Sequence, residues 1–223
     1  MFKEVTRLYD GQYPVTAVNS LSLIIMRGEF LCLAGPSGSG KTTVLNLMAG
    51  LDRPTQGSII FDGQMLNHLS SHKLSRLRLL KIGFVFQELN LLPVLTAFEN
   101  IEFPLVLQKV PASERKRRTL KIMQELEILD LFHRKPSAMS GGQQQRVAVA
   151  RAVVTQPLLV LADEPTANLD STNAVRLIEL MHHLNQAHGI TFVIATHDHQ
   201  VISRAHRVIY LRDGQISSPS TKP

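Results

Sequence analysis

The feature that most constrains this chain is a glycine-rich run between a predicted strand and a predicted helix. The run is Gly35-Pro36-Ser37-Gly38-Ser39-Gly40-Lys41-Thr42, followed by Thr43. It fits the pattern G-x-x-x-x-G-K-[ST], in which the glycines let successive backbone N–H groups turn inward toward anionic oxygens. The lysine adds a cation for the β- and γ-phosphates of a nucleotide, and the threonine hydroxyl can ligate Mg²⁺. The pattern predicts a phosphate-binding loop.

The flanking sequence supports this interpretation. Residues 29–34 are mostly apolar and predict a buried strand, and residues 41–49 predict a helix that ends at Gly50. The helix start places the positive end of its dipole at the loop. A glycine-rich turn between two core elements is the alternative, and a strand before and a helix after the run favour the phosphate site.

A second constellation lies at the end of another apolar stretch. Residues 158–162 predict a strand, and Asp163 and Glu164 follow it directly. The carboxyl end of a parallel strand is where ligands of α/β proteins bind. Asp163 is therefore placed to hold Mg²⁺ beside the glycine-rich loop, and Glu164 is placed to act as a general base toward water.

A third motif is Ser140-Gly141-Gly142-Gln143, which opens a predicted helix over residues 143–155. A serine followed by two glycines at a helix start can form a second anion-binding N-terminus in the same chain. The plainer interpretation is an N-cap serine followed by small residues.

Together the three motifs resemble the ATP-binding subunit of ABC transporters, over nearly the whole chain. The resemblance implies that the chain binds ATP and Mg²⁺ and hydrolyses ATP to ADP and phosphate. It also implies a head-to-tail dimer, in which the loop of one copy and the signature motif of the other hold each ATP. The residues expected to bind the nucleotide from the second copy are Ser140, Gly141, Gly142 and Gln143.

Further positions match the family one by one. Gln87, after a predicted strand over residues 82–86, resembles the glutamine that touches Mg²⁺ and the attacking water, and Asp170 belongs to the stretch 168–170 that crosses the dimer interface. His197 resembles the switch histidine near the γ-phosphate. Tyr9 resembles the aromatic residue that stacks on adenine, with Tyr13 as the competitor. The resemblance thus assigns catalysis to Lys41, Gln87, Glu164 and His197, and Mg²⁺ binding to Thr42, Gln87 and Asp163.

The order of predicted elements indicates one α/β domain over residues 1–223. Its fold class is a P-loop NTPase core with a mostly parallel sheet, an N-terminal antiparallel β subdomain and an inserted α-helical subdomain. Residues 1–87 and 141–216 form the predicted core with its β subdomain, residues 88–140 the helical subdomain, and residues 217–223 a flexible tail. Within the helical stretch 97–132, Pro104 and Pro111 are expected to separate the helices. Other strands are predicted at 2–8, 18–26, 58–61, 190–195 and 208–211, and other helices at 70–80 and 171–188.

Composition narrows the cellular setting. The single cysteine excludes an internal disulfide, and the apolar runs are too short to span a bilayer. These features predict a cytosolic protein that does not itself span a membrane, and the family resemblance implies a peripheral position at the cytoplasmic face of a bacterial inner membrane. The net charge is +6, and its clearest basic run, residues 115–118, lies on a predicted helix without interleaved aromatic residues. A solvated helix face is favoured there, and no nucleic-acid partner is expected.

The motifs around Gln87 and residues 90–105 are similar to the group that contains the macrolide exporter, the lipoprotein-release ATPase and the cell-division ATPase. This similarity implies a transmembrane permease-type partner that is moved by ATP hydrolysis, for export or for mechanical work outside the cytoplasm. Two alternatives stay open. One is a soluble ABC-type ATPase that acts on DNA or ribosomes, and the other is a regulatory subunit that binds ATP without turnover.

Overall fold

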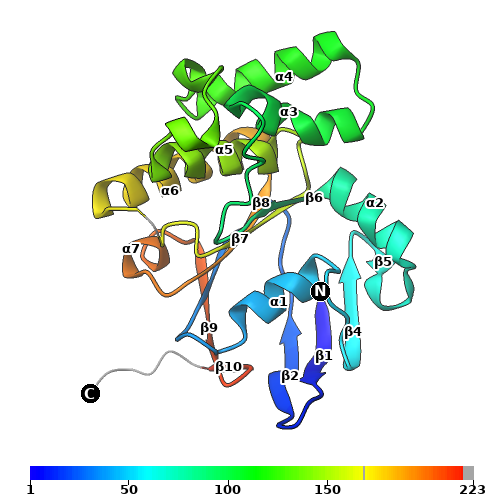
Figure 1. Cartoon of the computed structure of the whole chain (residues 1–223). Helices are drawn as coiled ribbons and strands as arrows, with labels where there is room; N and C mark the ends of the chain where they lie inside the picture. The colour runs from blue at the N-terminus through cyan, green and yellow to red at the C-terminus, as the bar shows by residue number, and fades with distance from the viewer. Residues whose placement is uncertain (168, 218–223) are drawn as a thin grey trace.

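The computed structural model describes residues 1–167 and 169–217, which form two β-sheets and the helices around them (Figure 1). The central sheet has the strand order β10-β9-β3-β8-β7-β6, and only β10 runs antiparallel to its neighbour. The second sheet has the order β2-β1-β4-β5 and is antiparallel throughout. The strands of the central sheet are β3 Phe30–Ala34, β6 Ile82–Val85, β7 Leu159–Asp163, β8 Thr191–Thr196, β9 Arg207–Arg212 and β10 Gln215–Ser217. Those of the second sheet are β1 Phe2–Tyr9, β2 Val15–Leu23, β4 Gln56–Phe61 and β5 Gln64–Met65.

The helices lie in layers on the two faces of the central sheet. Helices α3, α4 and α5 form a layer above it in Figure 1, and α1 lies between the two sheets. No helix in the described part of the chain is both long and apolar enough to cross a membrane. The helices are α1 Lys41–Met48, α2 Ser71–Lys81, α3 Ala97–Leu107, α4 Ala112–Glu125, α5 Gly141–Val153, α6 Ser171–His188 and α7 His199–Ile202, with short 3₁₀ turns at Leu66–His68, Leu129–Leu131 and Pro136–Ala138.

The central strands are buried on both faces, which is why they are nearly continuous apolar runs. Successive side chains alternate between two cores because the side-chain period of a strand is two. Phe192 and Ile194 of β8 join the core shared with α5 and α6, whereas Val193 and Ala195 join the core shared with α1 and β1. The helical layer and the antiparallel sheet are therefore held to opposite faces of the same sheet.

The α/β fold class and the mostly parallel sheet predicted from the sequence are confirmed, and several details are corrected. Pro104 does not separate two helices, because α3 continues through it to Leu107. Its ring removes one backbone hydrogen bond, but the buried side chains Ala97, Ile101 and Leu105 keep the helix packed on the core. Pro111 does mark a boundary, since it is the N-cap residue of α4.

The remaining differences concern short elements and ends. Strands β5 and β10 and helix α7 were not predicted, and α5 begins at Gly141, before the predicted start at residue 143. Ser217, predicted as part of the tail, lies in β10 and pairs with Tyr210 of β9. The rest of the predicted tail, residues 218–223, lies outside the described residues, as does Asn168 of the predicted interface stretch.

The contact between β6 and α5 gives a test of this packing. A Cβ atom on Gly83 would lie 2.1 Å from the carbonyl oxygen of Ala152, so backbone would have to move. We expect Gly83→Ala to lower the free energy of unfolding by about 1–3 kcal/mol, the usual cost of overpacking. Urea unfolding measures it, with Gly11→Ala as the control, because nothing lies within 4 Å of a Cβ there. Equal midpoints for the two variants would contradict this packing.

Candidate active site

The register of the parallel strands brings the predicted site together at one edge of the central sheet. β3 pairs with β8 through Ala34 and Thr196, and β7 pairs with β8 through Asp163 and Ala195. The glycine-rich loop follows β3, the two acids end β7, and His197 follows β8. Three segments that are far apart in the sequence therefore meet at the carboxyl ends of adjacent strands, where α/β folds bind ligands.

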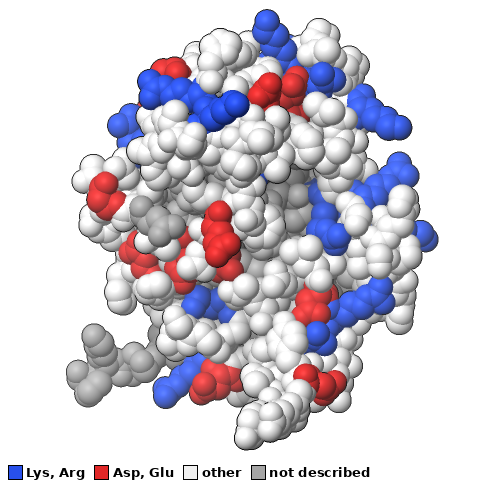
Figure 2. All heavy atoms as spheres, in the orientation of Figure 1, with Lys and Arg blue, Asp and Glu red and all other residues white. Residues whose placement is uncertain are grey.

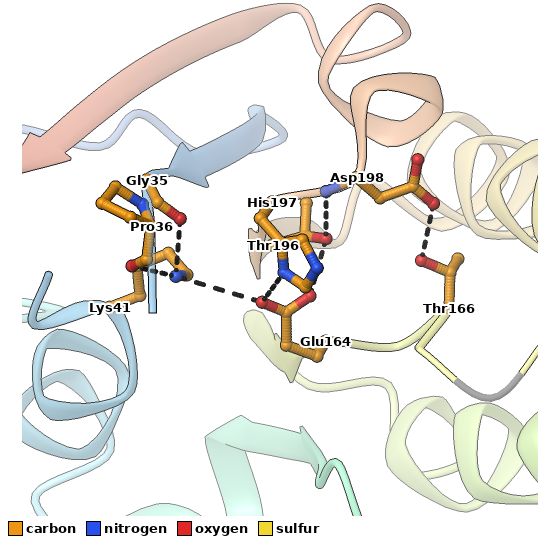
Figure 3. A network of polar contacts seen from close by, with 8 residues as sticks. All are labelled: Gly35, Pro36, Lys41, Glu164, Thr166, Thr196, His197 and Asp198. Atoms are coloured by element: carbon orange, nitrogen blue, oxygen red, sulfur yellow. Dashed lines mark hydrogen bonds and ion pairs between the residues drawn. The ribbon is translucent and has the colours of Figure 1, made fainter. Parts of the chain in front are cut away.

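The glycine-rich loop depends on the conformational freedom of glycine at the point where it joins α1. Gly40 is the N-cap of α1 with φ 100°, and a Cβ there would lie 2.3 Å from the carbonyl oxygen of Ala17. Within the loop, the Lys41 Nζ donates hydrogen bonds to the carbonyl oxygens of Gly35 (2.8 Å) and Pro36 (3.0 Å) (Figure 3). Lys41 is buried, so its ammonium is held at the loop rather than in solvent.

The hydroxyl group of Ser39 is a further polar feature of the loop. The hydroxyl oxygen of Ser39 is buried and has no hydrogen-bond partner in the part of the chain that the structure describes. A buried hydroxyl without a partner costs free energy, so it marks a place where an acceptor from outside is missing. The Ser39 hydroxyl and the Lys41 ammonium thus give the loop donors for an anionic group.

Glu164 lies at the centre of a polar network at the mouth of the loop (Figure 3). Its carboxylate accepts a hydrogen bond from the Thr196 hydroxyl (2.8 Å), lies 2.8 Å from the Nδ1 of His197, and is 4.0 Å from the Nζ of Lys41. Its backbone has φ 45°, which is uncommon for a residue other than glycine, and its N–H donates to the carbonyl of Ala195. The carboxylate is therefore fixed from several sides beside the lysine.

Asp163 provides a second carboxylate, and this residue is buried. Burial raises its pKa above the ordinary value, and the neighbouring charge of Glu164 acts in the same direction, whereas the hydroxyl of Thr42 and the charge of Lys41 lower it. A buried carboxylate beside an exposed threonine hydroxyl is a pair of hard oxygen donors, which is the kind of ligand that Mg²⁺ prefers. The two residues therefore fit a divalent cation.

Gln87 is placed near this pair by the sheet. β6 pairs with β7 through Val85 and Ala162, so the chain after β6 continues beside Asp163 and Glu164. The Gln87 side chain is exposed, and no hydrogen bond joins it to another side chain among residues 1–167 and 169–217. The structure thus brings Gln87 to the same edge of the sheet as Asp163 without fixing its side chain.

The other residues predicted for the site lie outside the glycine-rich loop. They are at the starts of α5 and α6 and at the end of β1. Ser140 and Gln143 form a capping box at the start of α5, and Asp170 is the N-cap of α6, where hydrogen bonds from the backbone and the side chain of Asn173 lower its pKa. Gly141 and Gly142 are the first residues of α5. Because α5 packs on one face of the sheet and α1 on the other, the two glycine-rich helix starts belong to different layers.

The aromatic candidates differ in how firmly they are held. The Tyr9 hydroxyl donates to an Asp52 carboxylate oxygen (2.7 Å), and the guanidinium of Arg7 lies 4.4 Å from its ring centroid. Tyr13 is 81% exposed. Tyr9 therefore presents an oriented ring, with a cation over one face.

Sequence reasoning missed two polar residues beside His197, which are Thr196 at the end of β8 and Asp198. The Thr196 hydroxyl also accepts from the backbone N–H of Asp198 (3.0 Å), whose carboxylate accepts from the hydroxyl of Thr166 (3.1 Å). These contacts tie the segment after Glu164 to the segment that carries His197. The available signal was the polar run directly after an apolar strand.

Comparisons with known proteins point to one family. The family model described as ABC transporter matches residues 18–167, which include the glycine-rich loop, both acids and the Ser140 motif. The chain belongs to the ABC transporter family. It is an ABC-type ATPase, as the sequence resemblance implied.

Individual relatives cover almost all of the chain. An ABC transporter ATP-binding protein of Thermotoga maritima is 42% identical over 96% of this chain and 91% of its own length. The macrolide export ATP-binding/permease protein MacB of Hyphomonas neptunium is 45% identical over 98% of this chain, which spans 34% of that longer protein. The ATP-binding cassette MJ0796 of Methanocaldococcus jannaschii, solved as a dimer bound to ADP and Pi, has a TM-score of 0.90 at 42% identity, over 97% of this chain and 96% of the other.

The buried state of Asp163 leads to a prediction about stability. Because the folded-state pKa is raised, ionisation of Asp163 destabilises the fold above that pKa, and this cost vanishes below the unfolded value near 3.9. We expect Asp163→Asn to unfold at a higher temperature than the wild type at pH 7 without nucleotide, with the difference shrinking toward pH 4. Thermal unfolding across that pH range measures it.

Asp62→Asn is the matched control with the opposite sign. Hydrogen bonding with Lys81 lowers the pKa of Asp62, so its ionised form stabilises the fold at pH 7 and that contribution is lost as the pH falls. Asp62→Asn should therefore lower the unfolding temperature at pH 7. A shift of the same sign for both variants would contradict the account of Asp163.

Proposed function

We propose that this chain is the ATP-hydrolysing subunit of an ABC-type membrane complex, with Glu164 as the general base. The observation that carries the proposal is the position of the Glu164 carboxylate, bonded to His197 and Thr196 and 4.0 Å from the Lys41 Nζ. A carboxylate fixed beside a phosphate-binding lysine can take the proton of an attacking water. The water oxygen then bonds to the γ-phosphorus, and ADP leaves with the electron pair of the broken bond.

In this proposal Lys41 exchanges partners when ATP binds. Its ammonium now donates to two carbonyl oxygens of its own loop, and phosphate oxygens would take their place. The start of α1 and the hydroxyl of Ser39 add further donors to the same anion. Loop residues 35–43 therefore bind the phosphates, and His197 holds the γ-phosphate side of the site next to Glu164.

Thr42, Asp163 and Gln87 are proposed to hold Mg²⁺. The fit rests on the buried carboxylate of Asp163 beside the hydroxyl of Thr42, with Gln87 at the same edge of the sheet. The cation would supply positive charge for the developing negative charge on the phosphates. Its binding would also relieve the cost of keeping Asp163 ionised.

The second copy is proposed to complete the site. Ser140, Gly141, Gly142 and Gln143 open α5 in the helical layer, whereas α1 packs on the other face of the sheet, so a head-to-tail partner would bring the missing helix start to the phosphates. MJ0796, at 42% identity, is described as dimeric, which supports this arrangement. Asp170 would lie at the same interface, and Tyr9 would stack on adenine, with Tyr13 as the alternative.

The membrane partner is proposed to be a transmembrane permease-type subunit of the exporting or force-transmitting kind. Relatives named macrolide export ATP-binding/permease proteins support this type, and a neighbour at 29% identity is described as part of the transporter complex cbiONQ. The chain would then be peripheral, at the cytoplasmic face of a bacterial inner membrane. The partner would attach beside the segment that follows Gln87, so that the nucleotide state of the site is transmitted to it.

Glu164→Gln tests the assignment of the base. We expect ATP hydrolysis to fall by roughly 10²-fold or more, the contribution of a positioned general base, while ATP binding and ATP-dependent dimerisation are kept. Phosphate release and size-exclusion chromatography with ATP and Mg²⁺ measure the two properties. Glu179→Gln on the exposed face of α6 is the control and should leave turnover unchanged. Unchanged turnover in Glu164→Gln would remove Glu164 from the mechanism.

The membrane complex is tested separately. Glu164→Gln, purified with ATP and Mg²⁺ from detergent-solubilised cells, should bring with it a protein that has transmembrane spans, identified by mass spectrometry. Ribosomal proteins or DNA-bound factors in its place would leave the ATPase chemistry standing and replace the membrane complex by a soluble ATPase.

A further inference from the structure

The hydroxyl of Tyr9, the residue proposed to stack on the base, is tied to a distant part of the chain. It donates a hydrogen bond to the Oδ2 of Asp52 at 2.7 Å, across 43 residues of sequence. The hydroxyls of Tyr13 and Tyr210, the other two tyrosines, make no hydrogen bond to any residue within 1–167 and 169–217. In that part of the chain, Tyr9 is therefore the tyrosine whose ring is oriented through its hydroxyl.

A guanidinium group covers one face of the same ring. The Nε of Arg7 donates to the same oxygen of Asp52 at 2.8 Å, and the guanidinium of Arg7 lies 4.4 Å from the centroid of the Tyr9 ring. This distance is within the range of a cation–π interaction. Tyr9 is 38% exposed. A second planar group can therefore stack only on the face of the ring that is opposite to Arg7.

Asp52, which holds both side chains, is itself fixed. Its backbone N–H donates to the carbonyl of Asn46 in α1 (3.3 Å), and its Oδ1 accepts from the backbone N–H of Arg53 (2.7 Å). Burial acts to raise the pKa of Asp52, but the hydrogen bonds from Tyr9, from the backbone of Arg53 and from Arg7 outweigh it and lower the pKa below its ordinary value. The carboxylate is therefore ionised at neutral pH, and its hydrogen bonds are of the stronger, charge-assisted kind.

Helix α1 connects this cluster to the glycine-rich loop. Asp52 is bonded to the end of the helix, and the start of the helix lies at the loop. At that start, a Cβ on Gly40 would lie 2.3 Å from the carbonyl oxygen of Ala17 in β2, and β2 pairs with the strand that carries Tyr9. The Tyr9 ring is thus joined to both ends of the helix whose start is the proposed phosphate site.

We infer that Asp52 is a positioning residue for the nucleobase: its carboxylate holds the Tyr9 hydroxyl and, together with Arg7, presents one face of the ring to adenine before the nucleotide binds. The inference rests on the proposed function, which places adenine on Tyr9. A ring that is already ordered loses little conformational freedom when a base stacks on it. The arrangement therefore strengthens the binding of the base and leaves the binding of the phosphates unaffected.

Electrostatic repulsion alone predicts the opposite effect of Asp52. A nucleotide is an anion, so a nearby carboxylate repels it, and removal of that charge should tighten binding. Loss of a positioning contact should weaken binding, so the direction of the change separates the two explanations. On the face shown in Figure 2, acidic and basic side chains lie next to one another over the second sheet, so a single charge there acts mainly on its near neighbours.

Calorimetry with ADP and with inorganic pyrophosphate tests the inference, because both ligands carry a diphosphate and only ADP carries the base. We expect Asp52→Asn to weaken ADP binding about 3- to 10-fold, the fold-change for a side chain that must be ordered on binding, and to leave pyrophosphate binding unchanged. In steady-state kinetics the KM for ATP should rise while kcat stays the same. Asp10→Asn is the matched control, because it removes the same charge from the exposed neighbour of Tyr9, and it should weaken neither ligand.

Tyr9→Phe removes the same hydrogen bond from the other side. It keeps the aromatic ring and leaves Asp52 bonded to Arg7 and Arg53, so it tests the inference even if Asp52→Asn disturbs the fold. We expect Tyr9→Phe to weaken ADP binding by the same factor as Asp52→Asn. The double variant should bind ADP no more weakly than either single variant, because both changes remove one interaction. Additive losses would show that the two residues act separately and would overturn the inference.

The outcomes separate this inference from the proposed function. If Tyr9→Ala leaves the ratio of ADP to pyrophosphate affinity unchanged, the base does not stack on Tyr9, and that part of the proposed function fails. If Tyr9→Ala lowers the ratio but Asp52→Asn and Tyr9→Phe do not, only the inference fails. Equal losses of ADP and pyrophosphate affinity in Asp52→Asn would give Asp52 a structural role, and tighter ADP binding would leave charge repulsion as its effect. Either result overturns the inference.

Discussion

The parallel hydrogen-bond ladder between β3, β8 and β7 is the constraint on which the rest of the site depends. It aligns Ala34 with Thr196 and Asp163 with Ala195, so the next residues of each strand lie at one edge. A shift of one residue in this register would reverse every side chain of a strand and exchange the two cores. The same ladder therefore fixes the packing of both helical layers and the distance between Lys41 and Glu164.

The sequence allowed the central strands and the glycine-rich loop to be predicted because their signals are local. A buried strand, a glycine-rich turn and a helix start follow one another within twenty residues, and each has its own pattern. The short elements β5, α7 and β10 could not be found in this way, because two to four residues carry no periodicity. The helix through Pro104 was mispredicted because tertiary packing outweighs the local preference of a proline.

The candidate site shows the same division. Glu164, Asp163 and Lys41 were predicted from motifs, but the contacts that hold Glu164 were not, since the Thr196 hydroxyl reaches it only through the pairing of two strands. The contacts of Arg151 show the same limit, because its guanidinium reaches the carbonyl oxygens of Leu89 and Asn90 only through the packing of α5 beside β6.

Helix α5 connects the two ends of the proposed mechanism. It begins at Gly141, within the motif expected to meet the nucleotide of a second copy, and it carries Arg151 near its other end, roughly 15 Å away at 1.5 Å per residue. Arg151 also holds the carbonyl oxygens of Leu89 and Asn90, just after Gln87. A shift of α5 on nucleotide binding would therefore move Arg151 and the segment after Gln87 with it, and a partner that moves that segment would in turn displace α5, because linkage between two sites is reciprocal.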